Sequence, residues 1–193
     1  MPIFICIDGI DGSGKSTQIK RLAQWLEDRG RPVECTREPG GTPAGAAIRA
    51  ILVNKESKLE HDTEMLLFCA DRAEHQVKIR KLLAEGKDIL CDRFLPSTWA
   101  YQVYGRGLES SLFEEVTQRT VSTFPALTII LDMDVSVALR RSLSRLKAEG
   151  KEVDEGRFES EKEDFFRKVK EGFRWYASQK EFGRSVLIDA SGS

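Results

Sequence analysis

The chain has 193 residues, a length that suits one domain spanning residues 1–193, and 40% of them are hydrophobic, enough to fill a core. The net charge of -1 gives no overall attraction to nucleic acid or to a membrane surface, so we expect neither as a partner. No apolar run approaches the length of a membrane span, and a strand-like stretch follows Pro2 directly, which leaves no room for a signal peptide. These features predict a cytoplasmic protein.

The cysteines and histidines give little support for metal or disulfide chemistry. Cys6, Cys35, Cys69 and Cys91 are far apart and form no C-x-x-C pair, and three of them lie in apolar, strand-like stretches. We interpret them as reduced, mostly buried cysteines rather than as disulfide partners or metal ligands. The chain has only 2 histidines, which disfavours a zinc site and a Ser-His-Asp triad.

Short apolar segments alternate with longer amphipathic segments along the chain. The predicted strands are Ile3–Asp8, Pro32–Thr36, Asp88–Asp92, Leu127–Asp132 and Ser185–Ile188. A strand–helix–strand alternation is typical of a parallel sheet that is covered by helices on both faces. The sequence therefore predicts an α/β fold with three layers.

Two of the intervening segments have a clear helical pattern. In the first, Ile19, Ala23 and Leu26 fall on one helical face, and Gly30 follows as a stop signal. The second covers Thr63–Leu83 and begins with the apolar run M-L-L-F-C-A. That run fits a buried or subunit-facing helix.

Residues 144–163 form the segment that least resembles a core. They are highly charged, contain glycine and include almost no apolar residues. We interpret this segment as a mobile lid, of the kind that excludes water from an active site. A solvated connection between two helices is the alternative.

Residues 9–17 read G-I-D-G-S-G-K-S-T and match the phosphate-binding pattern G-x-x-x-x-G-K-[ST]. The motif follows a predicted strand and opens a predicted helix, a context in which backbone N–H groups and a helix N-terminus hold phosphate oxygens. Lys15 then reaches the β- and γ-phosphates. The residues expected to bind ATP in this loop are Gly9, Gly12, Ser13, Gly14, Lys15, Ser16 and Thr17.

A Mg²⁺ ion is expected beside this loop. The Ser16 hydroxyl is one predicted ligand, and an acidic ligand should follow a neighbouring strand. Asp92 and Asp132 both end predicted strands, but Asp132 and Asp134 precede a helical pattern and can serve as helix caps. We favour Asp92 as the metal ligand, with Arg93 as a cation beside it.

Other motifs narrow the class of phosphate acceptor. A GTPase needs N-K-x-D to read guanine, whereas residues 54–57 read N-K-E-S and do not follow a strand. A kinase for a phosphorylated small molecule needs separate cations, for which Arg37, Arg72 and Arg93 are candidates. Phe68 and Arg72 lie four residues apart on a predicted helix, so they share a face that suits a planar base. A core Phe beside a surface Arg is the more common reason for such a pair.

Four motifs resemble those of one enzyme family in order and spacing. They read F-I-C-I-D-G-I-D-G-S-G-K-S-T-Q, T-R-E-P-G-G-T-P, L-L-F-C-A-D-R-A-E-H and D-R-F-L-P-S-T-W-A-Y-Q. The chain resembles the thymidylate kinase family over almost its whole length. The resemblance implies a P-loop NTPase-like fold with five parallel strands in the order 2-3-1-4-5 and a short lid. It also implies a homodimer that transfers the γ-phosphate of MgATP to dTMP, giving dTDP and ADP for dTTP biosynthesis.

The resemblance also implies roles at single positions. Asp11 resembles an acidic loop residue that accepts a hydrogen bond from the 3′-hydroxyl of the acceptor, so its carboxylate faces away from the ATP phosphates. Phe68 resembles the residue that stacks on thymine, and Arg72 resembles the donor to the base O4. Tyr101 resembles the ring that crowds the 2′ position and disfavours ribonucleotides. The other dTMP-binding positions implied are Arg37 and Arg93 at the acceptor phosphate and Ser97, Thr98 and Gln102 in the base pocket.

A catalytic arginine is expected in the lid. One class of thymidylate kinases carries this arginine inside the phosphate loop, but positions 10–13 read I-D-G-S here, so the chain resembles the other class. Arg140 resembles the arginine that packs on adenine, and Arg141 is a further candidate. We prefer Arg145 and Arg157 as lid arginines, with ordinary surface salt bridges as their alternative role. The implied catalytic set is Lys15, Asp92, Arg93, Arg145 and Arg157.

Three positions depart from the pattern of the family. Asp8 stands where Glu is usual, which affects the local support of the loop, and Phe94 replaces a common Tyr. Gly156 replaces an Asp that often precedes the lid arginine, which weakens the case for Arg157.

Two other functions stay open on the sequence. A kinase for dUMP or UMP is one, because the methyl group missing from dUMP is worth only about 1–3 kcal/mol in an apolar pocket. A nucleotide-binding regulator without transfer activity is the other, and the presence of Lys15, Asp92 and Arg93 disfavours it.

Overall fold

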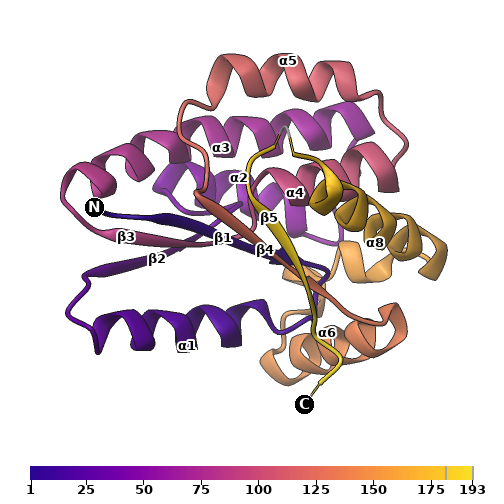
Figure 1. Cartoon of the computed structure of the whole chain (residues 1–193). Helices are drawn as coiled ribbons and strands as arrows, with labels where there is room; N and C mark the ends of the chain where they lie inside the picture. Colours follow the sequence, from indigo (N-terminus) through magenta and orange to yellow (C-terminus); the bar gives the residue numbers. More distant parts are fainter. Residues whose placement is uncertain (181, 193) are drawn as a thin grey trace.

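The computed structural model describes residues 1–180 and 182–192, and its centre is a parallel sheet (Figure 1). The strands are β1 (Phe4–Gly9), β2 (Val33–Arg37), β3 (Asp88–Asp92), β4 (Leu127–Asp132) and β5 (Ser185–Asp189). They are ordered β2-β3-β1-β4-β5, and each neighbouring pair is parallel. The predicted fold and strand order are confirmed, and the strand boundaries differ from those predicted by about one residue.

Helices cover both faces of this sheet. On one face α1 (Lys15–Glu27) packs through Ile19, Ala23 and Leu26 against β1 residues Ile5 and Ile7. The larger core on the other face lies under α3 (His61–Ala84), α5 (Ser110–Thr120) and α8 (Glu163–Ser178). The other described elements are α2 (Pro43–Val53), α4 (Leu95–Thr98), the π-helical η1 (Trp99–Gly105), α6 (Val135–Glu149), α7 (Glu152–Glu155) and the 3-10 turn η2 (Phe158–Ser160).

Burial explains why β1 reads as a continuous apolar run. All six of its residues are buried, because both faces of a central parallel strand pack against helices. At the end of this strand, Asp8 and Gly9 begin the turn into α1, which places the predicted phosphate loop at the carboxyl edge of the sheet. The carboxyl ends of parallel strands are the usual place for ligands in such folds.

The segment predicted to be a lid, residues 144–163, contains the end of α6, then α7 and η2. It lies against α2 and the residues that follow it. The Lys55 backbone N–H donates to Val153 O at 2.8 Å, and Arg49 Nη2 lies 2.7 Å from Glu155 Oε2. The segment therefore has a defined docking site on the rest of the molecule, and its role as a lid stays a prediction.

All four cysteines are free thiols, as predicted. Cys6, Cys69 and Cys91 are buried, whereas Cys35 is exposed on the edge strand β2. Within the described residues, no helix combines the length and the apolar composition that crossing a membrane requires.

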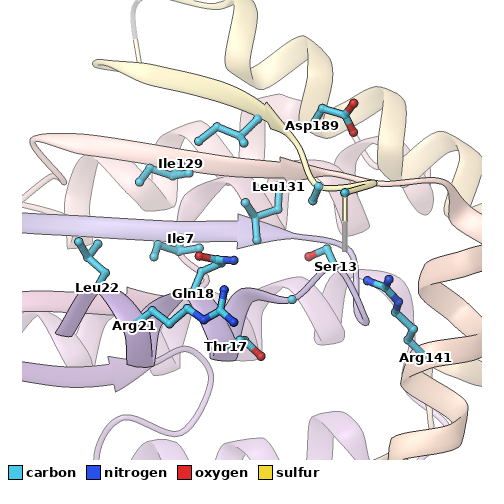
Figure 2. A pocket seen from close by; sticks show the side chains of 14 residues that line it. Ile7, Ser13, Thr17, Gln18, Arg21, Leu22, Ile129, Leu131, Arg141 and Asp189 are labelled. Carbon is cyan, nitrogen blue, oxygen red and sulfur yellow. The ribbon is translucent and has the colours of Figure 1, made fainter. Parts of the chain in front are cut away.

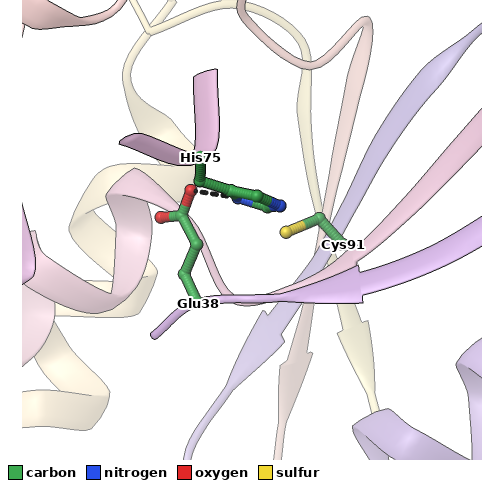
Figure 3. Close-up of side chains that lie close together, drawn as sticks. All are labelled: Glu38, His75 and Cys91. Carbon is green, nitrogen blue, oxygen red and sulfur yellow. Dashed lines mark hydrogen bonds and ion pairs between the residues drawn. The ribbon is translucent and has the colours of Figure 1, made fainter. Parts of the chain in front are cut away.

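Glu38, His75 and Cys91 bring three groups of metal-binding type within 4.8 Å of one another (Figure 3). The His75 Nδ1–H lies 2.9 Å from Glu38 Oε1, and Arg72 Nε donates to Glu38 Oε2 at 2.7 Å. The other ring nitrogen of His75 lies 2.7 Å from Thr36 Oγ1. Because these polar atoms already have partners and a guanidinium lies alongside, the group acts as a hydrogen-bond network between the β2–α2 loop and α3.

The carboxyl group of Asp71 makes the free energy of unfolding depend on pH. Its buried carboxylate accepts a hydrogen bond from Gly40 N at 2.9 Å, and burial together with the charge of Glu38 raises its pKa to about 6. A carboxyl whose pKa is higher in the folded chain than in the unfolded chain binds a proton on folding. This group therefore stabilises the fold less as the pH rises from about 4 to about 6.

We expect Asp71→Asn to remove this pH dependence. Between about pH 4 and pH 7 the wild type should lose up to about 3 kcal/mol of unfolding free energy relative to the variant. Urea unfolding of both proteins across this range measures the difference. A difference that does not change with pH would contradict the assignment.

Candidate active site

The phosphate loop connects β1 to α1, and its glycines are required by local geometry. Gly9, Gly12 and Gly14 have φ values of 136, 83 and 98°, in the region that side chains disfavour. A Cβ atom on Gly12 would also collide with the backbone carbonyl of Ala138 in α6. The positive φ values turn the loop around the N-terminus of α1, an arrangement of the kind that binds phosphate.

Lys15 is the first residue of α1, and its side chain is buried within the loop. Its ammonium group donates to Gly9 O at 2.9 Å and to Ile10 O at 3.0 Å, and it lies 3.8 Å from Asp11 Oδ1. Burial and the positive charge of Arg93 lower the pKa of Lys15. A cation in this position faces the phosphates of a nucleotide held by the loop.

Ser16 and Asp92 meet at the mouth of the loop. The Ser16 hydroxyl donates to Asp92 Oδ2 at 3.2 Å, and Asp92 Oδ1 is buried without a hydrogen-bond partner among the described residues. An oxygen pair with an unpartnered carboxylate atom fits a Mg²⁺ ion. The alternative acid, Asp132, forms ion pairs with Lys170 at 3.3 Å and Arg174 at 2.7 Å.

Asp8 connects the phosphate loop to the chain that follows β3. Its fully buried carboxylate accepts hydrogen bonds from Gly9 N at 2.8 Å, Phe94 N at 3.1 Å and Ser97 N at 3.1 Å. The Ser97 hydroxyl adds a further one at 2.7 Å. Arg93, directly before Phe94, has a left-handed φ of 70°, which is uncommon for a residue with a side chain.

The Arg93 guanidinium organises the centre of the site. It lies 2.8 Å from Asp11 Oδ1, donates to Ser97 Oγ at 2.7 Å and lies over the Tyr101 ring at 5.2 Å. The Tyr101 hydroxyl lies 3.3 Å from Asp11 Oδ2. Burial alone would raise the pKa of Asp11, but Arg93 and Lys15 hold it below its usual value, so the carboxylate is ionised.

Two cavities meet at this centre. The larger, about 560 Å³, contains the phosphate loop together with Arg37 and Asp92. The smaller, about 90 Å³, is lined by Phe68, Tyr101 and Gln102. Five residues line both cavities, namely Asp11, Arg49, Arg93, Arg145 and Glu155. A group bound in one cavity therefore faces a group bound in the other across a boundary made of charged side chains.

A third cavity, about 510 Å³, lies on the other side of the loop, between α1 and strands β1, β4 and β5 (Figure 2). Its apolar walls include Ile7 and Leu131, and Arg21 and Arg141 bring positive charge. Such a slot suits the flat base of a nucleotide whose phosphates lie in the loop. Arg140, the arginine expected at adenine, is exposed and is not among the residues that line this cavity.

Arg72, expected to donate to the base, is almost fully buried and is not among the residues that line the smaller cavity. It donates to Glu38 at 2.7 Å, to Phe94 O at 3.1 Å and to Thr98 Oγ1 at 3.0 Å. Its Nη1 is buried without a partner among the described residues, so one donor is left over for a ligand. Thr98, expected in the base pocket, instead supports Arg72 and is not among the residues that line the cavity.

The two preferred lid arginines are in different environments. Arg145 is exposed on α6 and lines both cavities. Arg157 is buried, with Nη2 2.6 Å from Glu64 Oε2 and Nη1 donating to Leu52 O at 3.1 Å. The geometry therefore favours Arg145 as the arginine that faces bound phosphates.

Several residues of the site were missed by the sequence analysis. Arg49 and Glu155 line both cavities, and their places on α2 and α7 gave them no motif. Phe158, from the docked lid segment, lies 6.2 Å from the Phe68 ring and 5.5 Å from the Tyr101 ring, measured between ring centroids. Glu64 is buried one helical turn before Phe68, and a charged residue within the apolar start of α3 was the available signal.

Comparison with known proteins identifies the family of this chain. The thymidylate kinase family model matches residues 7–193. The thymidylate kinase of Solidesulfovibrio magneticus is 43% identical over 194 residues, which cover 99% of this chain and 92% of the relative. That of Syntrophotalea carbinolica is also 43% identical, over 100% of this chain and 90% of the relative. The crystal structure of thymidylate kinase from Ehrlichia chaffeensis superposes with a TM-score of 0.75 at 34% identity, covering 97% of this chain and 88% of that one. The chain therefore belongs to the thymidylate kinase family, the nucleoside monophosphate kinases that convert dTMP to dTDP.

Proposed function

We propose that the chain transfers the γ-phosphate of ATP to dTMP at the boundary between the phosphate-loop cavity and the base cavity. The observation that carries this proposal is the set of charged residues shared by the two cavities, above all Asp11, Arg93 and Arg145. A donor in one cavity and an acceptor in the other would bring the reacting phosphates together there. Holding two reactants in line is the main source of catalysis in phosphoryl transfer.

On the donor side, the loop N–H groups and Lys15 hold the β- and γ-phosphates, and the third cavity takes the adenine. Arg21 and Arg141, and not Arg140, are the arginines that line that cavity. Ser16 and Asp92 would hold Mg²⁺, which supplies positive charge against the phosphate oxygens when bound.

On the acceptor side, Phe68 lines the smaller cavity and stacks on thymine. The Nη1 of Arg72, which is buried without a partner among the described residues, donates to O4. Asp11 accepts a hydrogen bond from the 3′-hydroxyl, while the Tyr101 ring restricts the 2′ position. Arg93 binds the acceptor phosphate, with Arg37 and Arg49 as further cations of the larger cavity.

In the reaction an oxygen of the dTMP phosphate attacks the γ-phosphorus of ATP. The bond between that phosphorus and the β–γ bridging oxygen breaks, and ADP leaves with the bonding electrons. Arg93 and Arg145 stabilise the charge on the transferred group, and Lys15 stabilises the charge that develops on ADP.

We also propose that the protein is a cytoplasmic homodimer. Support for a dimer comes from an apolar stripe on α3, in which Leu66, Ala70, Ala73 and Val77 follow helical spacing. Leu66 and Val77 are 45% and 56% exposed, large values for apolar side chains on the same face of a long helix.

The acceptor assignment is tested by ADP release with MgATP and a panel of acceptors. Turnover should be highest with dTMP, lower with dUMP and poor with UMP and AMP.

Removing the 3′-hydroxyl of dTMP should lower kcat/KM by roughly 10-fold or more, because a hydrogen bond to a carboxylate is lost. In Asp11→Ala, the ratio of kcat/KM for dTMP to that for its 3′-deoxy analogue should fall toward unity. The preference for dTMP over the corresponding ribonucleotide should stay unchanged. A retained 3′ preference in the variant would contradict the role of Asp11.

The lid assignment is tested by Arg145→Ala. Loss of this cation should lower kcat on the order of 100-fold or more, because it faces the transferred group. Lys147→Ala is the matched control, since it removes the same charge from an exposed position on the same helix. Steady-state kinetics of both variants measure kcat. An equal fall in kcat in the two variants would exclude Arg145 as the catalytic lid residue.

The dimer is tested by Leu66→Glu. A charge in the centre of an apolar interface should shift the protein to a monomer, as measured by light scattering after size exclusion. Glu115→Lys, on the exposed surface of α5, serves as a control for a change of charge. A monomeric wild type, or a variant that stays dimeric, would contradict the proposed α3 interface.

A further inference from the structure

The carboxylate of Glu64 is buried at the start of α3, and the catalytic account above leaves it without a role. Its Oε1 accepts hydrogen bonds from Gln102 Nε2 at 2.7 Å and from Arg106 Nε at 3.3 Å. Its Oε2 lies 2.6 Å from Arg157 Nη2 and accepts a hydrogen bond from Arg106 Nη2 at 3.2 Å. Glu64 is thus surrounded by donors from η1, from Arg106 directly after it and from the lid segment.

This environment keeps Glu64 ionised. Burial alone would raise its pKa, but hydrogen bonds from Arg106 and Gln102 and the charge of Arg157 hold the pKa below its usual value. An ionised carboxylate only accepts hydrogen bonds. The side-chain amide of Gln102 must therefore point its NH₂ group toward Glu64. This contact fixes the orientation of an amide that could otherwise be rotated by 180°.

Gln102 also lines the base cavity, beside Phe68 and Tyr101. With its NH₂ group committed to Glu64, the amide oxygen is the strong hydrogen-bonding atom left for a base. We propose that Glu64 is a positioning residue for base specificity, which fixes the Gln102 amide so that its oxygen accepts a hydrogen bond from a pyrimidine N3–H. This inference rests on the proposed function, in which the smaller cavity holds the acceptor base.

The proposal explains discrimination at one atom of the base. Thymine and uracil carry a hydrogen on N3, whereas N3 of cytosine is an acceptor. An amide oxygen facing N3 attracts the first two and repels the third. A site built to hydrogen-bond one group rejects an analogue that lacks it strongly, because its polar atom is left unpaired.

Glu64→Gln should reverse the orientation of the Gln102 amide. The amide oxygen of the new side chain would take the Oε2 position, which faces Arg157 and Arg106 Nη2. Its NH₂ group would take the Oε1 position, where it would donate to Gln102 and lose the long 3.3 Å hydrogen bond from Arg106 Nε. Gln102 then has to present its oxygen to residue 64 and its NH₂ group to the base, which favours the N3 of cytosine.

The experiment measures kcat/KM for dTMP and dCMP and compares their ratio among variants. The ratio should fall at least 10-fold in Glu64→Gln, with dCMP gaining relative to dTMP. Gln102→Leu removes the reading group and should also lower the ratio. In the Gln102→Leu background, Glu64→Gln should change the ratio no further. Glu161→Gln, which removes another carboxylate partner of Arg106, should leave the ratio unchanged.

Gln102→Glu provides a second test that leaves Glu64 in place, in case the buried Glu64→Gln variant fails to fold. A carboxyl group at position 102 would share a proton with Glu64 and still present an oxygen to the base. We expect it to retain most of the preference for dTMP. A fall to the level of Gln102→Leu would overturn the proposal.

The remaining outcomes separate this inference from the proposed function. If Glu64→Gln lowers turnover with both nucleotides equally, Glu64 acts only on folding or on the lid, and the inference is wrong. If Gln102→Leu leaves the ratio unchanged, Gln102 does not read the base and the inference is wrong, whereas the acceptor panel still tests the proposed function separately.

Discussion

The buried carboxylate of Asp8 holds together the two loops on which the site depends. It accepts hydrogen bonds from Gly9 at the start of the phosphate loop and from Phe94 and Ser97 beyond β3. Each donor would otherwise be buried without a partner, at a cost of about 1–3 kcal/mol. Arg93, which has a left-handed φ of 70°, directly precedes the anchored Phe94, and its own backbone N–H donates to Ile7 O at 3.0 Å. The central arginine is thus held between β1 and a chain segment that Asp8 anchors.

A chain of alternating charges extends from this anchor. Arg93 Nη1 lies 3.6 Å from Asp8 Oδ1, and Arg93 Nη2 lies 2.8 Å from Asp11 Oδ1. Lys15 lies 3.8 Å from the same Asp11 oxygen. Asp11 is therefore stabilised by cations on both sides, which resolves how an acid persists in a loop that binds phosphate. Its carboxylate lines both cavities, so it can face a group bound in either one.

The sequence predicted those site residues whose positions follow from a short motif or from the end of a strand. Lys15 and Ser16 follow from the motif at the end of β1, and Asp92 follows from its place at the end of β3, next to β1 in the sheet. The lid arginines were harder to rank, because their surroundings depend on docking. Arg157 meets Glu64, which lies 93 positions earlier in the sequence, and no periodicity links the two. Thr98 shows the same limit, since its hydroxyl supports Arg72 instead of facing the cavity.

The two ends of the lid segment have different surroundings. Its later part is fixed to α2 and α3 by Arg49–Glu155 and Glu64–Arg157, and it brings Phe158 against the rings of the base cavity. Its earlier part, on α6, carries Arg145 to the boundary of the two cavities. Docking of the later part therefore brings Phe158 to the wall of the smaller cavity, while the earlier part brings Arg145 to the boundary that this cavity shares with the larger one. If the smaller cavity holds the acceptor, as we propose, the same contacts enclose it and hold Arg145 beside the transferred phosphate.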